Sequence, residues 1–285
     1  MSSSLKGVLL GLAGFCLFSV ADATIKLLGD HYQPVQIVAF ASGLTLPLIG
    51  LLWLKTRATL VPRHPWLMLV RTVALVANAL LVTYTFAALP LAQAYAIFFT
   101  MPLVLTLLAW PVLGDRVDAM GGLAVVLGLI GVIVALNPGR VEFGLGHAAA
   151  VAGMLMAAVH YLIIRRIGGA ESSEALLFWP VLGQAAVALL LLPGRYVPMP
   201  AADLATVASI SVTGMGGTLL MFAAYRVAPP VVVAPTQYSQ IAFAALFGAL
   251  FFDEPMTAQM ALGMCIIAAA GVLVVLRQER QKSVA

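Results

Sequence analysis

Seven polar side chains lie deep inside long apolar runs of this 285-residue chain, where each group needs a hydrogen-bonding partner or water. Phenols, amides, an imidazole and a carboxylate together offer donors, acceptors and titratable protons. This is the chemistry that holds a small polar metabolite. Because lipid exposure of so many polar groups would be costly, we expect them to converge on a shared wet interior as a binding site. The residues are Asp22, Asn78, Tyr95, His160, Tyr161, Gln237 and Tyr238.

Asp22 is the one carboxylate well inside an apolar run, and it has two interpretations. Lys26 follows one helical turn later, at a spacing that permits a structural ion pair. Alternatively, Asp22 lines the wet interior or exchanges protons. His160 presents a similar choice, because a histidine can bind protons near neutral pH or hydrogen-bond to a neighbouring helix.

A run of five polar residues, 236–240, follows Pro229, Pro230 and Pro235. Such a run wraps around a helix, so part of it must face protein or water. The prolines remove backbone donors and would leave carbonyl oxygens open to a ligand. This segment is the strongest local indication of a binding site. Its alternative interpretation is hydrogen bonding between helices.

The composition requires that most of the surface face lipid. Hydrophobic residues make up 62% of the chain and charged residues 9%, against roughly 25% charged in soluble domains. A helix needs about 20 apolar residues to cross the hydrocarbon core. The sequence therefore predicts an all-α integral membrane protein with ten transmembrane helices. The expected spans are 5–28, 34–54, 66–88, 92–113, 119–137, 145–164, 173–193, 204–226, 230–251 and 257–276.

The basic residues predict the orientation of these spans, because cytoplasmic loops carry an excess of Lys and Arg. With the N-terminus in the cytoplasm, only Lys26, Arg140 and Arg195 fall on the outer side. We therefore expect both termini to be cytoplasmic. The net charge of +4 then reflects topology, and no nucleic acid partner is expected. The twelve cytoplasmic residues are Lys6, Lys55, Arg57, Arg63, Arg71, Arg116, Arg165, Arg166, Arg226, Arg277, Arg280 and Lys282.

The chain repeats itself at an offset of about 136–140 residues. The segment that begins at Phe86 matches the one at Phe222, and the segment at Gly131 matches the one at Gly271. We therefore expect a first five-helix repeat in 1–139 and a second in 140–285. Because five is odd, the two repeats must be inverted. Inverted repeats are typical of secondary transporters, which bind substrate near the midplane of the membrane.

The same motifs resemble a known family over essentially the whole chain. The matching stretches are 18–29, 89–94, 99–102, 113–117, 225–229, 233–239 and 253–255. They resemble the EamA-type family of the drug/metabolite transporter superfamily, and among its members YddG-type amino-acid exporters and S-adenosylmethionine-type permeases. The resemblance implies two five-helix repeats around a central cavity, with the fifth and tenth helices peripheral. It also implies substrates such as amino acids.

These observations predict a secondary transporter of a small-molecule substrate in the cell inner membrane, multi-pass and surrounded by lipid. Aromatic or neutral amino acids are favoured, because aromatic and hydroxyl groups outnumber charges along the spans. Import of S-adenosylmethionine or a related metabolite is the alternative. No nucleotide-binding motif is present, so a gradient must drive transport, with protons as a candidate coupling ion. A monomer and a homodimer both stay open.

An intramembrane lipid-modifying enzyme is the alternative from a different class. It would need a metal cluster, an activated nucleophile or a carboxylate pair. The four histidines are far apart in the sequence, and the two cysteines lie in separate apolar runs. We therefore expect no enzyme, no metal site and no cofactor.

Overall fold

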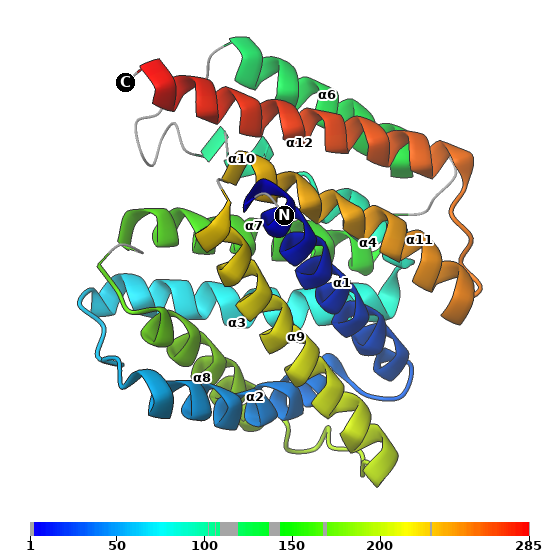
Figure 1. The fold of residues 1–285 in the computed structure, drawn as a ribbon. Coiled ribbons are helices and arrows are strands. Elements are labelled where there is room, and N and C mark those ends of the chain that lie inside the picture. The colour runs from blue at the N-terminus through cyan, green and yellow to red at the C-terminus, as the bar shows by residue number, and fades with distance from the viewer. Residues whose placement is uncertain are drawn as a thin grey trace. The chain divides into compact units, whose positions relative to one another are not determined.

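The computed structural model describes residues 3–101, 103–105, 107–108, 119–136, 143–167, 170–228 and 230–284. These residues form helices joined by short loops, without a strand among them, as Figure 1 shows. The expected all-α fold is therefore confirmed. The helices are α1 (Ser3–Gly29), α2 (Pro34–Thr56), α3 (Pro65–Ala88), α4 (Leu91–Phe98), α6 (Ala119–Leu136), α7 (Leu145–Ile167), α8 (Ser173–Leu191), α9 (Ala201–Val227), α10 (Pro230–Val233), η1 (Ala234–Tyr238), α11 (Ser239–Phe251) and α12 (Ala258–Val284).

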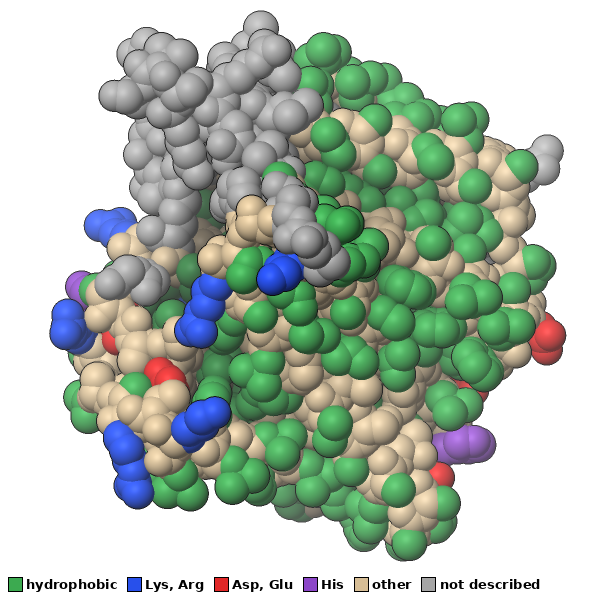
Figure 2. All heavy atoms as spheres, viewed as in Figure 1, with side chains coloured by type: hydrophobic (Ala, Val, Ile, Leu, Met, Phe, Trp, Pro, Cys, Tyr) green, Lys and Arg blue, Asp and Glu red, His purple; other side chains and the backbone are tan. Residues whose placement is uncertain are grey.

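Within the described residues, six helices are long and apolar enough to cross a membrane. Shorter apolar helices occur at Leu91–Leu105, Val125–Leu136 and Ala258–Leu273. Hydrophobic side chains cover much of the face seen in Figure 2, as the composition requires of a protein that contacts lipid. The end of the expected span 92–113 lies outside the described residues, as do Arg116 and Arg140. The six segments are Leu5–Gly29, Pro34–Thr56, Pro65–Ala88, Leu145–Ile164, Ser173–Leu191 and Ala201–Val227.

Contacts divide the chain into two compact units, and each unit draws on both halves of the sequence. Unit 1 contains 1–20, 89–147 and 216–285, and unit 2 contains 21–88 and 148–215. The division cuts through α1 and α9, so that each of these helices contributes to both units.

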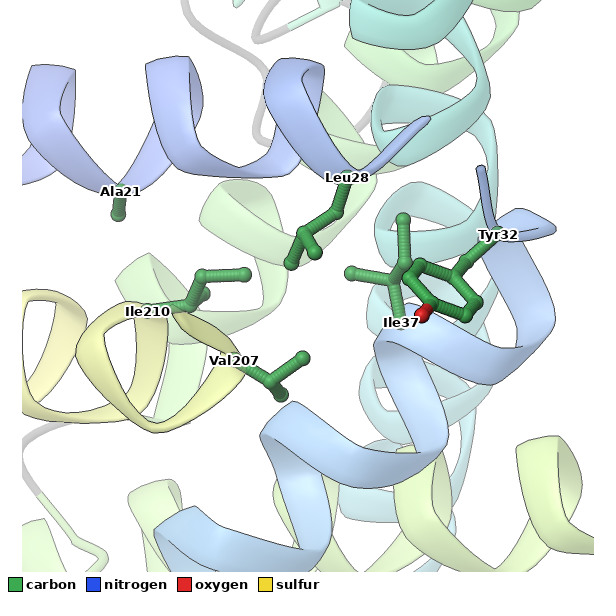
Figure 3. Close-up of a cluster of buried hydrophobic side chains, with 6 residues drawn as sticks. All are labelled: Ala21, Leu28, Tyr32, Ile37, Val207 and Ile210. Carbon is green, nitrogen blue, oxygen red and sulfur yellow. The ribbon is translucent and has the colours of Figure 1, made fainter. Parts of the chain in front are cut away.

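Unit 2 has a hydrophobic cluster in which α1, α2 and α9 meet. Leu28, Ile37, Val207 and Ile210 point toward one another there, with Tyr32 beside Ile37 (Figure 3). All four aliphatic side chains are at least nine-tenths buried. Van der Waals packing of such side chains stabilises the contact of these helices.

Two loops are joined by hydrogen bonds next to this cluster. The Tyr32 hydroxyl donates to Asp203 Oδ2 at 2.5 Å, and the Gln36 amide exchanges two hydrogen bonds with the backbone of Val197 at 2.6 and 2.9 Å. The hydrogen bond to Asp203 raises the pKa of Tyr32 to about 12, with burial and the charges of Asp203 and Tyr196 adding to it. The α1–α2 and α8–α9 loops therefore lie at the same end of unit 2.

The α2–α3 and α7–α8 loops are joined in the same way. The Glu171 carboxylate accepts the backbone N–H groups of Arg63 and His64 at 3.0 and 2.8 Å. Trp179 Nε1 donates to the Leu60 carbonyl at 2.8 Å. Burial opposes ionisation of Glu171, but these donors and the His64 ring together hold its pKa below the usual value. The α2–α3 and α7–α8 loops therefore lie at the same end of unit 2.

Unit 1 is held together by small residues that let helix backbones approach closely. A Cβ atom on Gly263 of α12 would lie 2.4 Å from the Ala135 nitrogen of α6, and one on Gly131 would lie 2.9 Å from the Gly263 oxygen. In α1, a Cβ on Gly11 would lie 2.4 Å from Thr236 Oγ1. In membranes, helices associate through close backbone contacts of this kind rather than through contacts between large side chains.

Candidate functional site

Two apolar helices of unit 1 are interrupted by tighter turns. In the second half of the chain, α10 gives way to the 3-10 helix η1 (Ala234–Tyr238) before α11 begins. In the first half, α4 ends at Phe98, and Phe99 and Thr100 form a turn before the helix resumes at 101. Interrupted helices are typical of transporter binding sites, since they present backbone groups to a ligand. The sequence predicted a single span over 230–251, and the structure shows that this segment changes to a 3-10 helix at Ala234.

The two interruptions each contain the same kind of hydrogen bond. Thr100 Oγ1 donates to the Ile97 carbonyl at 2.6 Å, and Thr236 Oγ1 donates to the Val233 carbonyl at 2.6 Å. Both threonines are 8% exposed. The residues of one pair lie 136 positions after those of the other, which is the offset of the Phe86 and Phe222 motifs. The repeat therefore extends from the sequence to the local hydrogen bonding at these breaks.

Three aromatic residues lie against one another at these breaks, and we call them the aromatic cluster: Tyr95, Phe99 and Tyr238. The rings of Tyr95 and Phe99 are stacked with centroids 5.5 Å apart, and the Tyr238 ring meets Phe99 edge-on at 5.6 Å. Gln240 Nε2 donates to the Tyr95 hydroxyl at 3.4 Å. Tyr95 and Phe99 are buried, whereas Tyr238 is partly exposed. The structure thus brings two of the expected site residues together, and Gln237 adjoins them in η1.

The four remaining expected residues belong to unit 2. Asn78 of α3 donates through Nδ2 to the Gly153 carbonyl of α7 at 2.9 Å, so its own carbonyl oxygen stays available as an acceptor. His160 is 9% exposed, and its ring centroid lies 4.9 Å from that of Tyr161. Tyr161 itself is 46% exposed. The hydrogen bond of Asn78 is the interhelical kind that sequence reasoning kept as an alternative for polar residues.

Asp22 lies partly buried in α1 and has contacts of its own. Lys26 is 9% exposed, and its Nζ atom donates to the Phe86 carbonyl at 3.4 Å. Lys26 is therefore tied to α3, an interaction that the sequence did not suggest. The ion pair between Asp22 and Lys26 stays a prediction.

Sequence reasoning assigned Arg71 only to the cytoplasmic side and did not place it in a site. The structure shows its side chain 4% exposed in the second turn of α3, with electrostatic interactions with His160 and Tyr161. A signal was present in the sequence, because Arg71 lies inside the expected span 66–88 rather than before it. Intramembrane cations are rare and mark functional positions.

Among the described residues, no three His, Cys, Asp or Glu side chains lie close enough together to hold a metal ion. Hydrogen bonding, ring stacking and electrostatic attraction are therefore the interactions that these two groups of residues offer a ligand. Such interactions suit reversible binding of a small molecule.

Several known proteins are similar to this chain over nearly its whole length. The chain is similar to the S-adenosylmethionine uptake transporter of Rickettsia felis, at 23% identity over 99% of this chain and 98% of that protein. It is also similar to the pseudopaline exporter CntI of Pseudomonas aeruginosa, at 26% identity over 93% and 94% of the two chains. A crystal structure with 16% sequence identity has the same fold, with a TM-score of 0.69 over 99% of each chain.

The family comparison covers nearly the whole sequence. The model of the EamA-like transporter family matches twice, over residues 5–137 and 144–277. Helices long and apolar enough to cross a membrane accompany both matches. The chain therefore belongs to the EamA-like transporter family, and it is a membrane transporter of the drug/metabolite type.

Proposed function

We propose that this transporter carries a small neutral or zwitterionic metabolite across the inner membrane, with aromatic and thioether amino acids as preferred substrates. The aromatic cluster at the two helix breaks is the observation that supports this choice. Tyr238 is its partly exposed member, and Phe99 supports the Tyr238 ring from one edge. A ring or a thioether of the substrate gains by packing on such a surface.

The proposed architecture is ten membrane spans in two inverted repeats, 1–139 and 140–285, with both termini cytoplasmic. A duplicated chain is supported by the two matches of the family model and by the equivalent hydrogen bonds that Thr100 and Thr236 each donate three residues back. The pairing of alternate loops in unit 2 supports spans that cross in alternating directions. Inverted repeats can exchange conformations, which gives alternating access to the substrate.

We propose seven substrate-binding residues, in two groups. Those in unit 1 offer ring faces and an amide in η1, and those in unit 2 offer hydrogen-bonding and titratable groups. Unit 1 contributes Tyr95, Gln237 and Tyr238, and unit 2 contributes Asp22, Asn78, His160 and Tyr161.

The driving force is proposed to be a gradient, with protons as the coupling ion and Asp22 as the group that binds them. Asp22 lies inside the span Leu5–Gly29, where an ionised carboxylate is costly. Binding or release of a proton there therefore changes the free energy of the protein strongly. Asp22→Asn should abolish the dependence of uptake on a pH gradient, while counterflow of substrate, which needs no gradient, continues at a reduced rate. If Asp22 instead serves the structure alone, the variant will mainly lower the folded yield.

Import of S-adenosylmethionine or a related metabolite is the second candidate. A sulfonium cation is attracted to the face of an aromatic ring, and Tyr238 offers such a face. The similarity to the Rickettsia felis uptake transporter supports this candidate, whereas the similarity to the pseudopaline exporter supports export of a different metabolite.

The test is uptake and counterflow in proteoliposomes that contain the purified full chain. Radiolabelled phenylalanine, tryptophan, methionine, S-adenosylmethionine and aspartate should be compared, each with and without a pH gradient. We expect phenylalanine, tryptophan or methionine to exchange fastest, and Tyr238→Ala to reduce that exchange about tenfold or more, the loss expected for one stacked ring. Preference for aspartate would contradict the proposal, and chemical change of the vesicle lipids would favour an enzyme.

A further inference from the structure

Arg71 is buried although its guanidinium group is charged. Its side chain is 4% exposed, whereas Arg57, Arg166 and Arg226 are exposed, as are all other arginines whose side chains the structure describes. An arginine that serves only to hold a loop in the cytoplasm stays at the membrane interface. The burial of Arg71 inside the span Pro65–Ala88 therefore requires a different explanation.

The described residues leave most of the hydrogen-bonding capacity of Arg71 unused. A guanidinium group has five N–H donors. Nη1 donates to the Met68 sulfur at 3.6 Å, a weak acceptor, and Nε is buried without a hydrogen-bond partner. No carboxylate in the described part of the chain pairs with Arg71. Glu171 and Asp203, two carboxylates of unit 2, are bonded to other groups. An uncompensated buried cation is costly, which favours an anionic ligand.

Helix α7 brings two further polar groups to the same level as Arg71. Asn78 of α3 is bonded to Gly153 of α7. Arg71 lies seven residues before Asn78 in α3, and His160 lies seven residues after Gly153 in α7. Because the two helices are antiparallel, both residues lie at matching heights, about 10 Å along the axis from the hydrogen bond between Asn78 and Gly153. The electrostatic interactions of Arg71 with His160 and Tyr161 agree with this register.

His160 and Tyr161 of α7 add donors at the level of Arg71 along the helix axes. The His160 Nδ1 atom is buried without a hydrogen-bond partner in the described residues, so a neutral ring protonated there has a free donor. Tyr161 is 46% exposed, and its phenol can donate a further hydrogen bond at the accessible side of the group. Two unpartnered buried nitrogens on facing helices are a rare arrangement unless a ligand satisfies them.

We propose that Arg71, His160 and Tyr161 form an anion site that binds a carboxylate group of the transported metabolite. The planar fork of Arg71 matches two carboxylate oxygens, and His160 and Tyr161 supply additional donors. The site rests on the proposed transport function, because it holds the anionic end of a zwitterionic amino acid. It also explains how a chain with few intramembrane charges can distinguish an amino acid from a neutral amine or amide.

The first experiment measures anion binding without transport. The melting midpoint of the detergent-purified full chain is recorded in sodium benzoate, sodium acetate, sodium phosphate and sodium chloride at equal ionic strength. We expect the two carboxylates to raise the midpoint above the value in chloride. Arg71→Gln should remove that increase, Arg71→Lys should retain part of it, and Arg166→Gln, an exposed arginine of α7, should retain all of it.

Three outcomes would overturn the carboxylate site. They are no increase with either carboxylate in the wild-type protein, an increase that survives in Arg71→Gln, and an increase with phosphate alone. The last would assign Arg71 to a phosphate group, from a lipid headgroup or in free form. If Arg71→Gln does not fold, Tyr161→Phe and Arg71→Lys carry the comparison, and both should weaken the carboxylate effect.

The second experiment uses proteoliposomes and compares phenylalanine with phenylalaninamide as competitors of phenylalanine counterflow. In the wild type, the acid should compete about 10- to 100-fold better than the amide, the range expected for loss of charged hydrogen bonds. In Arg71→Lys, the ratio should shrink. Equal competition by acid and amide in a working transporter would disprove the site and leave the transport function standing. A carboxylate-dependent melting shift without any amino-acid counterflow would disprove the transport function and leave the anion site standing.

Discussion

The hydroxyl group of Tyr238 lies against the backbone of Gly271, so close that a Cβ atom at that position would be 1.3 Å from the phenolic oxygen. Gly271 of α12 therefore makes the space that holds the Tyr238 ring in the aromatic cluster. In the sequence, Gly271 stood out only as the repeat partner of Gly131. Its contact with a proposed substrate-binding residue connects α12 to the candidate site.

Gly271→Ala should displace the Tyr238 ring and lower both the melting midpoint and transport. Overpacking of this kind typically costs about 1–3 kcal/mol. The double variant Gly271→Ala/Tyr238→Ala should recover the midpoint but not transport, because the ring is then absent. Gly50→Ala is the matched control, since a Cβ there meets nothing within 4 Å. An unchanged midpoint in Gly271→Ala would show that Tyr238 does not occupy this space.

Thr236→Val should lower stability by about 1–3 kcal/mol, because the buried Val233 carbonyl loses the hydroxyl that donates to it. Thr100→Val should have an effect of similar size through Ile97, while the serine variants should be milder at both positions. Thermal unfolding in detergent measures all four. Thr206→Val serves as the control, because its hydroxyl is bonded to a helix carbonyl at an exposed site. Strongly unequal effects at 100 and 236 would argue against the structural equivalence of the two breaks.

Gln237→Leu should lower transport more than it lowers the yield of folded protein. Gln237 lies in η1 beside Tyr238, and we propose that its amide binds substrate. Gln184→Leu provides the contrast, because the Gln184 amide donates to the Leu75 carbonyl at 3.3 Å and connects α8 to α3. That variant should lower yield and transport together. Counterflow normalised to folded protein separates the two effects, and equal normalised rates for Gln237→Leu and wild type would remove Gln237 from the site.

The contact of Glu171 with Arg63 and His64 should make stability fall at acidic pH. The folded-state pKa of Glu171 is lowered, so its stabilising contribution is complete above the unfolded value near 4.5 and is lost as the pH falls through the folded value. Glu171→Gln should therefore be less stable than wild type at pH 7 and should lose less stability below pH 4.5. The exposed Asp30→Asn should leave the profile unchanged. Parallel melting profiles of Glu171→Gln and wild type between pH 7 and pH 3 would contradict the assignment.

Topology reporters fused after Arg140 and Arg195 should read periplasmic, and a reporter after Arg166 should read cytoplasmic. The positive-inside distribution predicts this pattern. The hydrogen bonds from the backbone N–H groups of Arg63 and His64 to the Glu171 carboxylate agree, because they place the α2–α3 and α7–α8 loops at one end of unit 2. A periplasmic signal after Arg166 would contradict the inverted arrangement of the repeats.

The sequence alone predicted six of the helices that are long and apolar enough to cross a membrane. The expected spans 34–54 and 66–88 correspond to α2 (Pro34–Thr56) and α3 (Pro65–Ala88). Length and apolar content decide this locally, since backbone groups in lipid must be bonded within their own helix. The 3-10 helix at Pro235 also has a local cause, because the missing N–H of a proline acts on its own turn.

Only the tertiary structure decided which side chains from distant parts of the sequence are in contact. The contact of Tyr95, Phe99 and Tyr238 joins residues more than 130 positions apart, and no local pattern records it. Arg71 has the same residue type as the exposed Arg57, and its burial depends on how neighbouring helices pack against α3. Helix periodicity shows which residues share a face, but the face that a neighbouring helix covers is a long-range property. Hydrophobic patterning is weak evidence here, because lipid and protein interior are similarly apolar.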